Sequence, residues 1–140
     1  MIGCLVMLLL SNAVFSQARI AVDLSNLRND KGVCRACLFN SPASFKGETG
    51  EPFKCVAVEI RNLMAQAIFN NIPAGTYAMF VFHDENRNST LDRNFLGIPK
   101  EGYGASKNKL PFAGAPTFEA NKFISDGKTP VTLKVKMRNL

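Results

Sequence analysis

Residues 76–82 read Thr-Tyr-Ala-Met-Phe-Val-Phe, a run that is apolar at nearly every position. Successive side chains of a β-strand point to opposite faces of its sheet. A strand with apolar side chains on both faces is normally covered on both, so this run predicts a central strand. Pro73 and Gly75 stand just before it as turn residues and place its start.

Shorter strand patterns lie on both sides of this run. Residues 18–24 and 131–137 alternate between apolar and polar positions, as a strand with one buried face does. Four further short strands are predicted, at residues 33–39, 55–60, 64–69 and 118–124. No segment keeps the 3.6-residue period of an amphipathic helix. We therefore predict an all-β fold, an antiparallel seven-stranded β-sandwich of the immunoglobulin-like or transthyretin-like kind, with one long loop over about residues 83–118.

The N-terminus predicts the compartment. Residues 2–15 carry no charge, and the apolar run at 4–10 is followed by small and polar residues. This pattern is typical of a secretory signal peptide, and the run is too short for a transmembrane helix. We predict a signal peptide over residues 1–17 and a single domain over residues 18–140. The mature protein is then exported, periplasmic or extracellular, and does not span a membrane.

Three cysteines remain after such a cleavage: Cys34, Cys37 and Cys55. Cys34 and Cys37 have CxxC spacing, but within a strand residues three apart face opposite sides, about 10 Å from each other. A disulfide cannot span that distance. The sequence offers no second CxxC or histidine pair to complete a zinc site. A bridge to Cys55 from either Cys37 or Cys34, between neighbouring strands, stays open.

The loop that follows the central strand is rich in oxygen ligands. They recur at every second residue, as in an EF-hand calcium loop: Asp84, Asn86, Asn88, Thr90 (through its carbonyl) and Asp92. The match is incomplete, because Ser89 replaces the usual glycine and Phe95 stands where a bidentate carboxylate is expected. The loop predicts a weak calcium site, and calcium is the one candidate cofactor. The alternative is an Asn- and Asp-rich loop held by Asx turns.

Residues 94–118 extend this loop beyond the length of a simple connection. Long loops are uncommon in small domains and are often functional. We expect four aromatic residues to pack the loop down as an ordered cap: Phe95, Tyr103, Phe112 and Phe118. Four candidate ligand-binding residues lie in or beside it: His83, Lys100, Glu101 and Tyr103. The alternative is that the loop only covers one open end of the sandwich.

Several of these segments resemble the DUF2141 family, exported bacterial proteins of unknown function. The resemblance is carried by Pro-Ala-Gly-Thr-Tyr at residues 73–77, Phe-His-Asp-Glu-Asn at 82–86, Gly-Ile-Pro-Lys-Glu-Gly-Tyr-Gly at 97–104 and Pro-Thr-Phe-Glu at 116–119. Family members typically show Asp-x-Asn-Gly-Asn-Gly in the acidic loop, where this chain has Arg87 and Ser89 in place of the glycines. Residues 73–77 also resemble the strand entry of transthyretin-like sandwiches. The resemblance implies fold and export, and it implies no activity.

Three functions are open. The favoured hypothesis is a non-enzymatic binding or accessory module of the bacterial cell envelope, with a glycan, peptide or protein ligand. The second is a hydrolase with its site at residues 83–118, in which His83 acts as general base. Spacing assigns no serine or cysteine nucleophile to it, so we name no catalytic residue. The third is a structural or assembly protein that uses an exposed sheet edge. The net charge of +6 is dispersed along the chain, so nucleic acid is not predicted as a partner.

Overall fold

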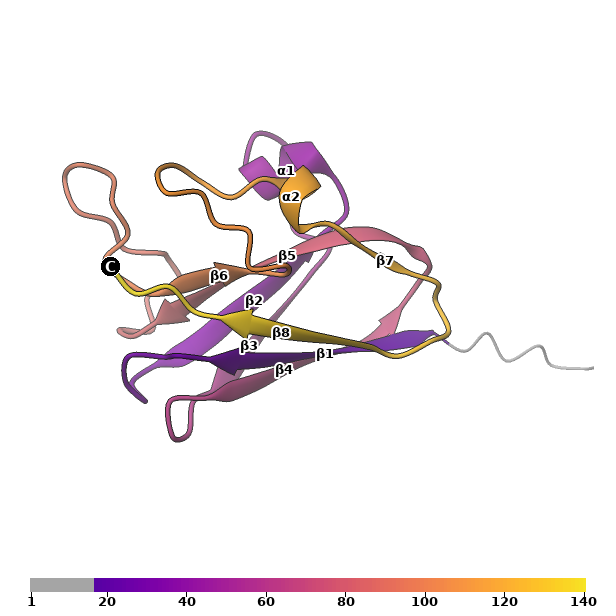
Figure 1. Ribbon diagram of the computed structural model, residues 1–140, viewed down its shortest axis with the longest axis horizontal. Helices are drawn as coiled ribbons and strands as arrows, with labels where there is room; N and C mark the ends of the chain where they lie inside the picture. Colours follow the sequence, from indigo (N-terminus) through magenta and orange to yellow (C-terminus); the bar gives the residue numbers. More distant parts are fainter. Residues whose placement is uncertain (1–16) are drawn as a thin grey trace, which may run out of the picture.

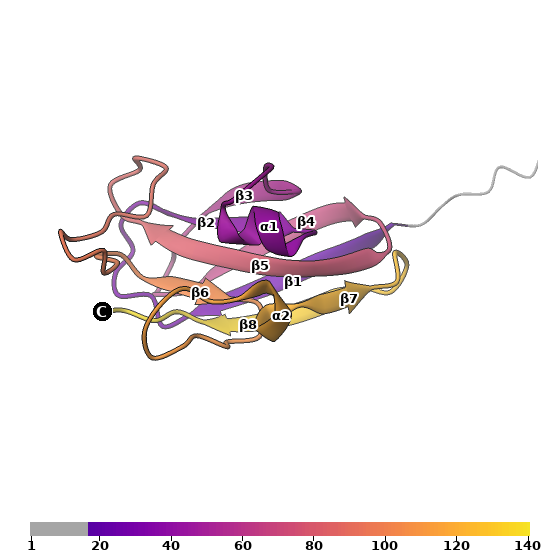
Figure 2. The same cartoon turned by 90° about the horizontal axis from the view of Figure 1, so that it is seen from above.

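The structure is a computed structural model that describes residues 17–140 (Figure 1). The predicted signal peptide, except for its last residue, lies outside the described residues. Within residues 17–140, no helix is long and apolar enough to cross a membrane. The described chain forms two β-sheets whose inner faces share one apolar core (Figure 2).

The smaller sheet has the strand order β4 (Ala65–Ile72), β1 (Ala18–Ser25), β8 (Val131–Lys136). β1 runs antiparallel to β4 and parallel to β8, so the first and last strands are neighbours. The alternation predicted for β1 matches its burial, since Ile20 and Val22 are fully buried while Asp23 is exposed. Each such buried aliphatic side chain contributes about 1.5–3 kcal/mol to stability.

The larger sheet has the order β3 (Lys54–Glu59), β2 (Val33–Phe39), β5 (Gly75–Asp84), β6 (Tyr103–Ala105), and β7 (Phe123–Ser125) also pairs with β5. The apolar run that predicted a central strand is β5, which has partners along both edges. Met79 and Val81 of β5 are fully buried in the core, and Phe80 and Phe82 alternate with them on the outer face. The all-β sandwich is confirmed, although the pairing of β1 with β8 is parallel where an antiparallel sandwich was predicted.

The structure has eight strands where seven were predicted. β6 is the addition, three residues inside the predicted loop, too short to show a period. The strand predicted at residues 118–124 is a helical turn, α2 (Phe118–Asn121), followed by β7. Thr117 starts α2, because its hydroxyl accepts the N–H of Ala120 at 3.2 Å. A second short helix, α1 (Pro42–Lys46), begins after the N-cap Ser41 and ends at Gly47.

The outer face of the larger sheet is partly covered by these short elements. Phe45 of α1 packs edge-on against Phe39 of β2, with ring centroids 5.3 Å apart, and against Phe118 of α2 at 6.1 Å. Figure 1 shows α1 and α2 next to each other above β5. Further along the same face, Tyr103 of β6 stacks on Phe80 of β5, with centroids 6.2 Å apart. This aromatic face is the base on which the long loop lies.

A disulfide joins Cys37 to Cys55, at directly opposed positions of β2 and the edge strand β3. Of the two pairings left open by the sequence, this is the one formed. Cys34 stays a free thiol inside the core, where burial raises its pKa to about 12. A buried thiol with such a pKa is unreactive at neutral pH, so the structure assigns Cys34 to packing.

Removal of the disulfide is expected to destabilise the fold without changing it. The bridge closes a loop with a sequence separation of 18, which contains α1. The double variant Cys37→Ala/Cys55→Ala should therefore lose about 3 kcal/mol of unfolding free energy in urea denaturation. Reduction of the wild type should give a similar loss and should leave the double variant unchanged. An unaltered midpoint in both experiments would contradict a stabilising role for the bridge.

Candidate functional site

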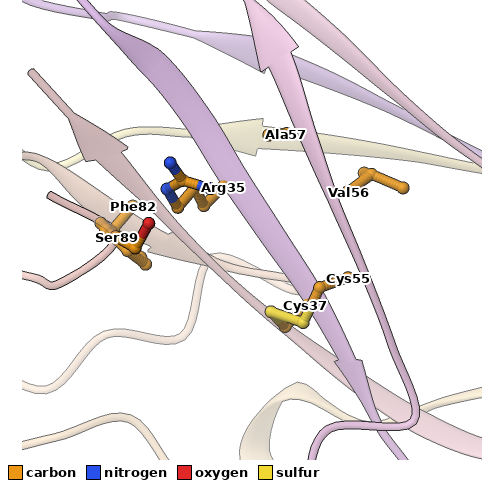
Figure 3. Close-up of a pocket in the computed structure, with 7 residues that line it drawn as sticks. All are labelled: Arg35, Cys37, Cys55, Val56, Ala57, Phe82 and Ser89. Carbon is orange, nitrogen blue, oxygen red and sulfur yellow. A yellow bond between two sulfur atoms is a disulfide. The ribbon is translucent and has the colours of Figure 1, made fainter. Parts of the chain in front are cut away.

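Two hollows lie on the outer face of the larger sheet. One is a shallow pocket of about 310 Å³ near β3, lined by the disulfide, Arg35, Phe82 and Ser89 (Figure 3). Figure 3 shows Arg35, Phe82 and Ser89 grouped on one side and the two cysteines together on another. The charge of Arg35 is already matched, because its guanidinium donates to the buried carboxylate of Asp84 at 2.6 Å. This pocket therefore presents an apolar, charge-neutral surface.

The second hollow, which we call the apolar groove, has a volume of about 730 Å³. Its floor includes the stacked rings of Phe80 and Tyr103. Two parts of the long loop line it, one within residues 91–99 and the other at residues 112–116, and we call them its two walls. Phe45 and Lys46 of α1 also line it.

Large apolar side chains stand exposed along this groove. Phe112 is fully exposed, Leu96 is 69% exposed and Ile98 is 45% exposed. Phe95, on the same loop, is 96% exposed. Of the four aromatic residues expected to pack the loop down, Tyr103 and Phe118 are buried, whereas for Phe95 and Phe112 the expectation is wrong. Apolar side chains gathered in the open are typical of surfaces that bind a ligand or a partner.

The charged side chains that line the groove are both basic. Arg93 and Lys46 are the charged residues among those that line it. Lys46 pairs with the exposed Glu48 at 2.9 Å. Arg93 donates to the carbonyl of Gly97 at 3.1 Å, and no ion pair involves it within residues 17–140. An apolar ligand with a negative group would match this lining.

The groove wall within residues 91–99 is held in place by the buried carboxylate of Glu101. One of its oxygens accepts the N–H of Glu85 at 2.7 Å, and the other accepts the N–H of Asp92 at 3.0 Å. These two residues lie at the two ends of the acidic loop, so Glu101 holds the ends together. Hydrogen bonds from two backbone N–H groups offset the cost of burying the charge.

Asp84 anchors the same loop from the end of β5. Burial alone would raise its pKa, but hydrogen bonds from Arg35 and from the N–H groups of Ser89 and Asn88 outweigh that effect. The pKa of Asp84 therefore lies below its ordinary value of 3.8. The carboxylate is charged at neutral pH and ties the loop to β2 through Arg35.

Glu85 completes this support. The guanidinium of Arg28 donates to both of its oxygens, which lowers the pKa of Glu85 and raises that of Arg28. Arg28 also donates to the carbonyl of Lys100 at 2.8 Å. The two ends of the 85–101 segment are thus fixed to the turn that follows β1.

The predicted calcium ligands lie together in one loop, but their oxygens are engaged with one another and with the chain. The amides of Asn86 and Asn88 donate to the two oxygens of Asp92, each at 2.7 Å, and the N–H of Thr90 donates to Asn88. Asp84 faces Arg35 instead. Within residues 17–140, no three His, Cys, Asp or Glu residues form a metal-binding group. Calcium binding stays a prediction, and a cation would have to displace Arg35 from Asp84.

The four predicted ligand-binding residues are separated by the fold. Tyr103 lines the groove and Lys100 is exposed outside it. Glu101 is buried and holds the two ends of the acidic loop together. His83 points into the core and is fully buried, with its Nε2 2.7 Å from the carbonyl of Lys31. A general base must reach the proton that it removes, so this position gives the hydrolase hypothesis no support.

Several groove residues were not predicted from the sequence: Leu91, Arg93, Leu96, Ile98 and Phe112. Their signal was present in the two segments Phe-Leu-Gly-Ile-Pro at 95–99 and Pro-Phe-Ala-Gly-Ala-Pro at 111–116. Both place apolar residues between glycine and proline, outside any strand pattern.

The model of the DUF2141 family, described as an uncharacterized protein conserved in bacteria, matches residues 22–132. No curated protein matches the chain. Among solved structures, the chain is similar to a fimbrial assembly protein from Parabacteroides distasonis, with 9% sequence identity and a TM-score of 0.37. The similarity covers 85% of this chain and 52% of that one, so the chain spans about half the length of that structure.

The support role of Asp84 predicts a pH-dependent loss of stability. A carboxyl whose pKa is lowered on folding stabilises the fold above its ordinary pKa, and this contribution is lost as the pH falls through the lowered value. Asp84→Asn should cost about 3 kcal/mol in urea unfolding at pH 7. It should also flatten the decline in stability that the wild type shows below pH 3.8.

Asp92→Asn is the matched control, because Asp92 is half-buried and its side chain accepts only from two amides. It should cost about 1 kcal/mol or less. Equal effects of the two substitutions at pH 7, or equal slopes at acid pH, would be incompatible with Asp84 as the anchor.

Proposed function

The chain belongs to the DUF2141 family, and we propose that this member is an exported, non-enzymatic binding module whose ligand lies in the apolar groove. The observation that carries the proposal is the exposure of Phe112 and Leu96 over an aromatic floor. Leaving such side chains in water is unfavourable by about 25 cal/mol per Å² of apolar surface relative to covering them. A ligand in the groove would cover them.

The organisation of the loop supports binding rather than catalysis. The carboxylate oxygens of Asp84, Glu85 and Glu101 accept hydrogen bonds from arginine side chains, amides or backbone N–H groups. These bonds hold the loop. A rigid support of this kind keeps a binding surface preorganised, which lowers the entropy lost when a ligand is bound. The floor lies on β5 and β6, so the site rests on the sheet rather than on loops alone.

The disulfide supports the proposed export. Disulfides form and persist in oxidising compartments such as the periplasm and the extracellular space, and they are rare in the cytosol of mesophiles. Cys55 is exposed, so a cytosolic reductant would have access to the bridge. This agrees with the signal peptide that the sequence predicts.

The groove is tested with anilinonaphthalene sulfonate, an aromatic anion that fluoresces when it leaves water. The wild type should bind the dye, and the double variant Leu96→Ser/Phe112→Ser should reduce the binding at least tenfold. Both side chains are largely exposed, so unfolding free energies should stay within about 0.5 kcal/mol of the wild type.

Ile124→Ser is the matched control. Ile124 is 76% exposed on β7 and does not line the groove, so the variant should bind the dye as the wild type does. Equal binding by all three proteins would show that the dye does not report on the groove, and absence of binding by the wild type would contradict the proposed site.

Export is tested by expressing the full chain in a bacterium and measuring the mass of the protein released from the periplasm or into the medium. We expect a mature chain that starts at residue 18, within one residue, and carries one disulfide. Recovery of the uncleaved chain in the cytosol alone would contradict the localisation.

A further inference from the structure

We propose that the occupant of the apolar groove is an extended segment of a partner protein, with apolar side chains that flank an acidic one. This inference rests on the groove as the binding site and adds the chemical class of the ligand. Three features of the groove argue for it: free backbone groups in one wall, apolar side chains on both sides, and a guanidinium, that of Arg93, with no ion pair within residues 17–140.

The wall at residues 112–116 offers backbone hydrogen-bonding groups that the fold does not use. Within residues 17–140, no hydrogen bond engages the N–H groups of residues 112–115 or the carbonyls of residues 112–116, although the carbonyls on either side, of Pro111 and Thr117, are bonded. Residues 112–115 are exposed. A peptide backbone supplies matching donors and acceptors at regular intervals, whereas an acyl chain supplies none along its length.

The apolar side chains are placed to receive side chains from such a segment. Phe112 stands on one wall, Leu96 and Ile98 stand on the other, and the rings of Phe80 and Tyr103 lie in the floor. An extended segment directs alternate side chains to opposite sides. Apolar residues at alternate positions would therefore enter the floor while the backbone runs along the 112–116 wall.

Positive charge selects an acidic residue in the segment. Arg93 and Lys46 are the charged lining residues, and Arg93 has a carbonyl as its hydrogen-bond acceptor and no carboxylate. A guanidinium binds a carboxylate through two parallel hydrogen bonds. Lys46 is already paired with Glu48, so a basic residue in the segment would face the like charge of Arg93, and acidic segments should be preferred.

The experiment uses tryptophan as a reporter, because the chain contains none of its own. The Phe112→Trp variant keeps an aromatic ring at the groove and places a single tryptophan there, which is excited selectively at wavelengths longer than those that tyrosine absorbs. The Ile124→Trp variant carries the same fluorophore on β7, outside the groove. Each is titrated with blocked peptides of sequence Leu-Glu-Leu-Glu-Leu, Leu-Gln-Leu-Gln-Leu and Leu-Lys-Leu-Lys-Leu, and with dodecanoate as the acyl-chain arm.

We expect the acidic peptide to change the fluorescence of Phe112→Trp and not that of Ile124→Trp. It should bind at least tenfold more tightly than the lysine peptide, and this preference should weaken at high salt. Adding Arg93→Gln should lower affinity for the acidic peptide about fivefold and leave that for the glutamine peptide unchanged. An acidic peptide with N-methylated backbone nitrogens should bind at least tenfold more weakly than its parent.

Several results would overturn the inference. Equal affinity for the acidic and lysine peptides would remove the charge argument, and equal affinity for the N-methylated peptide would remove the backbone argument. Tight binding of dodecanoate together with no peptide binding at millimolar concentration would assign the groove to an acyl chain. In each of these cases, dye binding by the wild type would still support the groove as a binding site. Failure of this inference is therefore distinct from failure of the proposed function.

Discussion

The two hydrogen bonds that Glu101 accepts fix the acidic loop to the larger sheet. Its carboxylate receives the N–H groups of Glu85 and Asp92, and the next residues of its own chain enter β6. The acidic loop is thereby tied to the strand that carries Tyr103 in the groove floor. A charge buried in this way is costly unless its oxygens are bonded, so the loop and the carboxylate stabilise each other. The groove wall within residues 91–99 is positioned by that contact.

Polar residues that look functional in the sequence serve here as supports. Asp84, Glu85 and Glu101 stand in the acidic and glycine-rich stretch that suggested metal or ligand chemistry, and each holds a loop end in the structure. The sequence cannot reveal this, because the partners are remote: Arg35 is 49 residues from Asp84, and Arg28 is 57 residues from Glu85. Pairing of such distant charges follows from the three-dimensional fold and not from any local pattern.

Local periodicity, by contrast, predicted the sandwich well. The alternation of β1 and β8 and the two-sided apolar run of β5 are properties of consecutive residues, and the register of the sheets confirms them. Elements of three to five residues were missed or misassigned, since β6 and α2 are too short for a period to show. The groove escaped prediction for another reason. Phenylalanine is usually buried in a core, and only the three-dimensional path of the loop leaves Phe112 exposed to water.

The parallel pairing of β1 with β8 has a consequence for the order in which the molecule is assembled. Ile20 lies opposite Val131, so the inner strand of the smaller sheet lacks one of its neighbours until nearly the whole chain has been synthesised. Contacts between segments so far apart in sequence slow folding. The smaller sheet is completed only when β8 becomes available, whereas the strands of the larger sheet all precede it in the sequence. The topology therefore makes closure of the smaller sheet a late event, separated from the synthesis of β1 by more than a hundred residues.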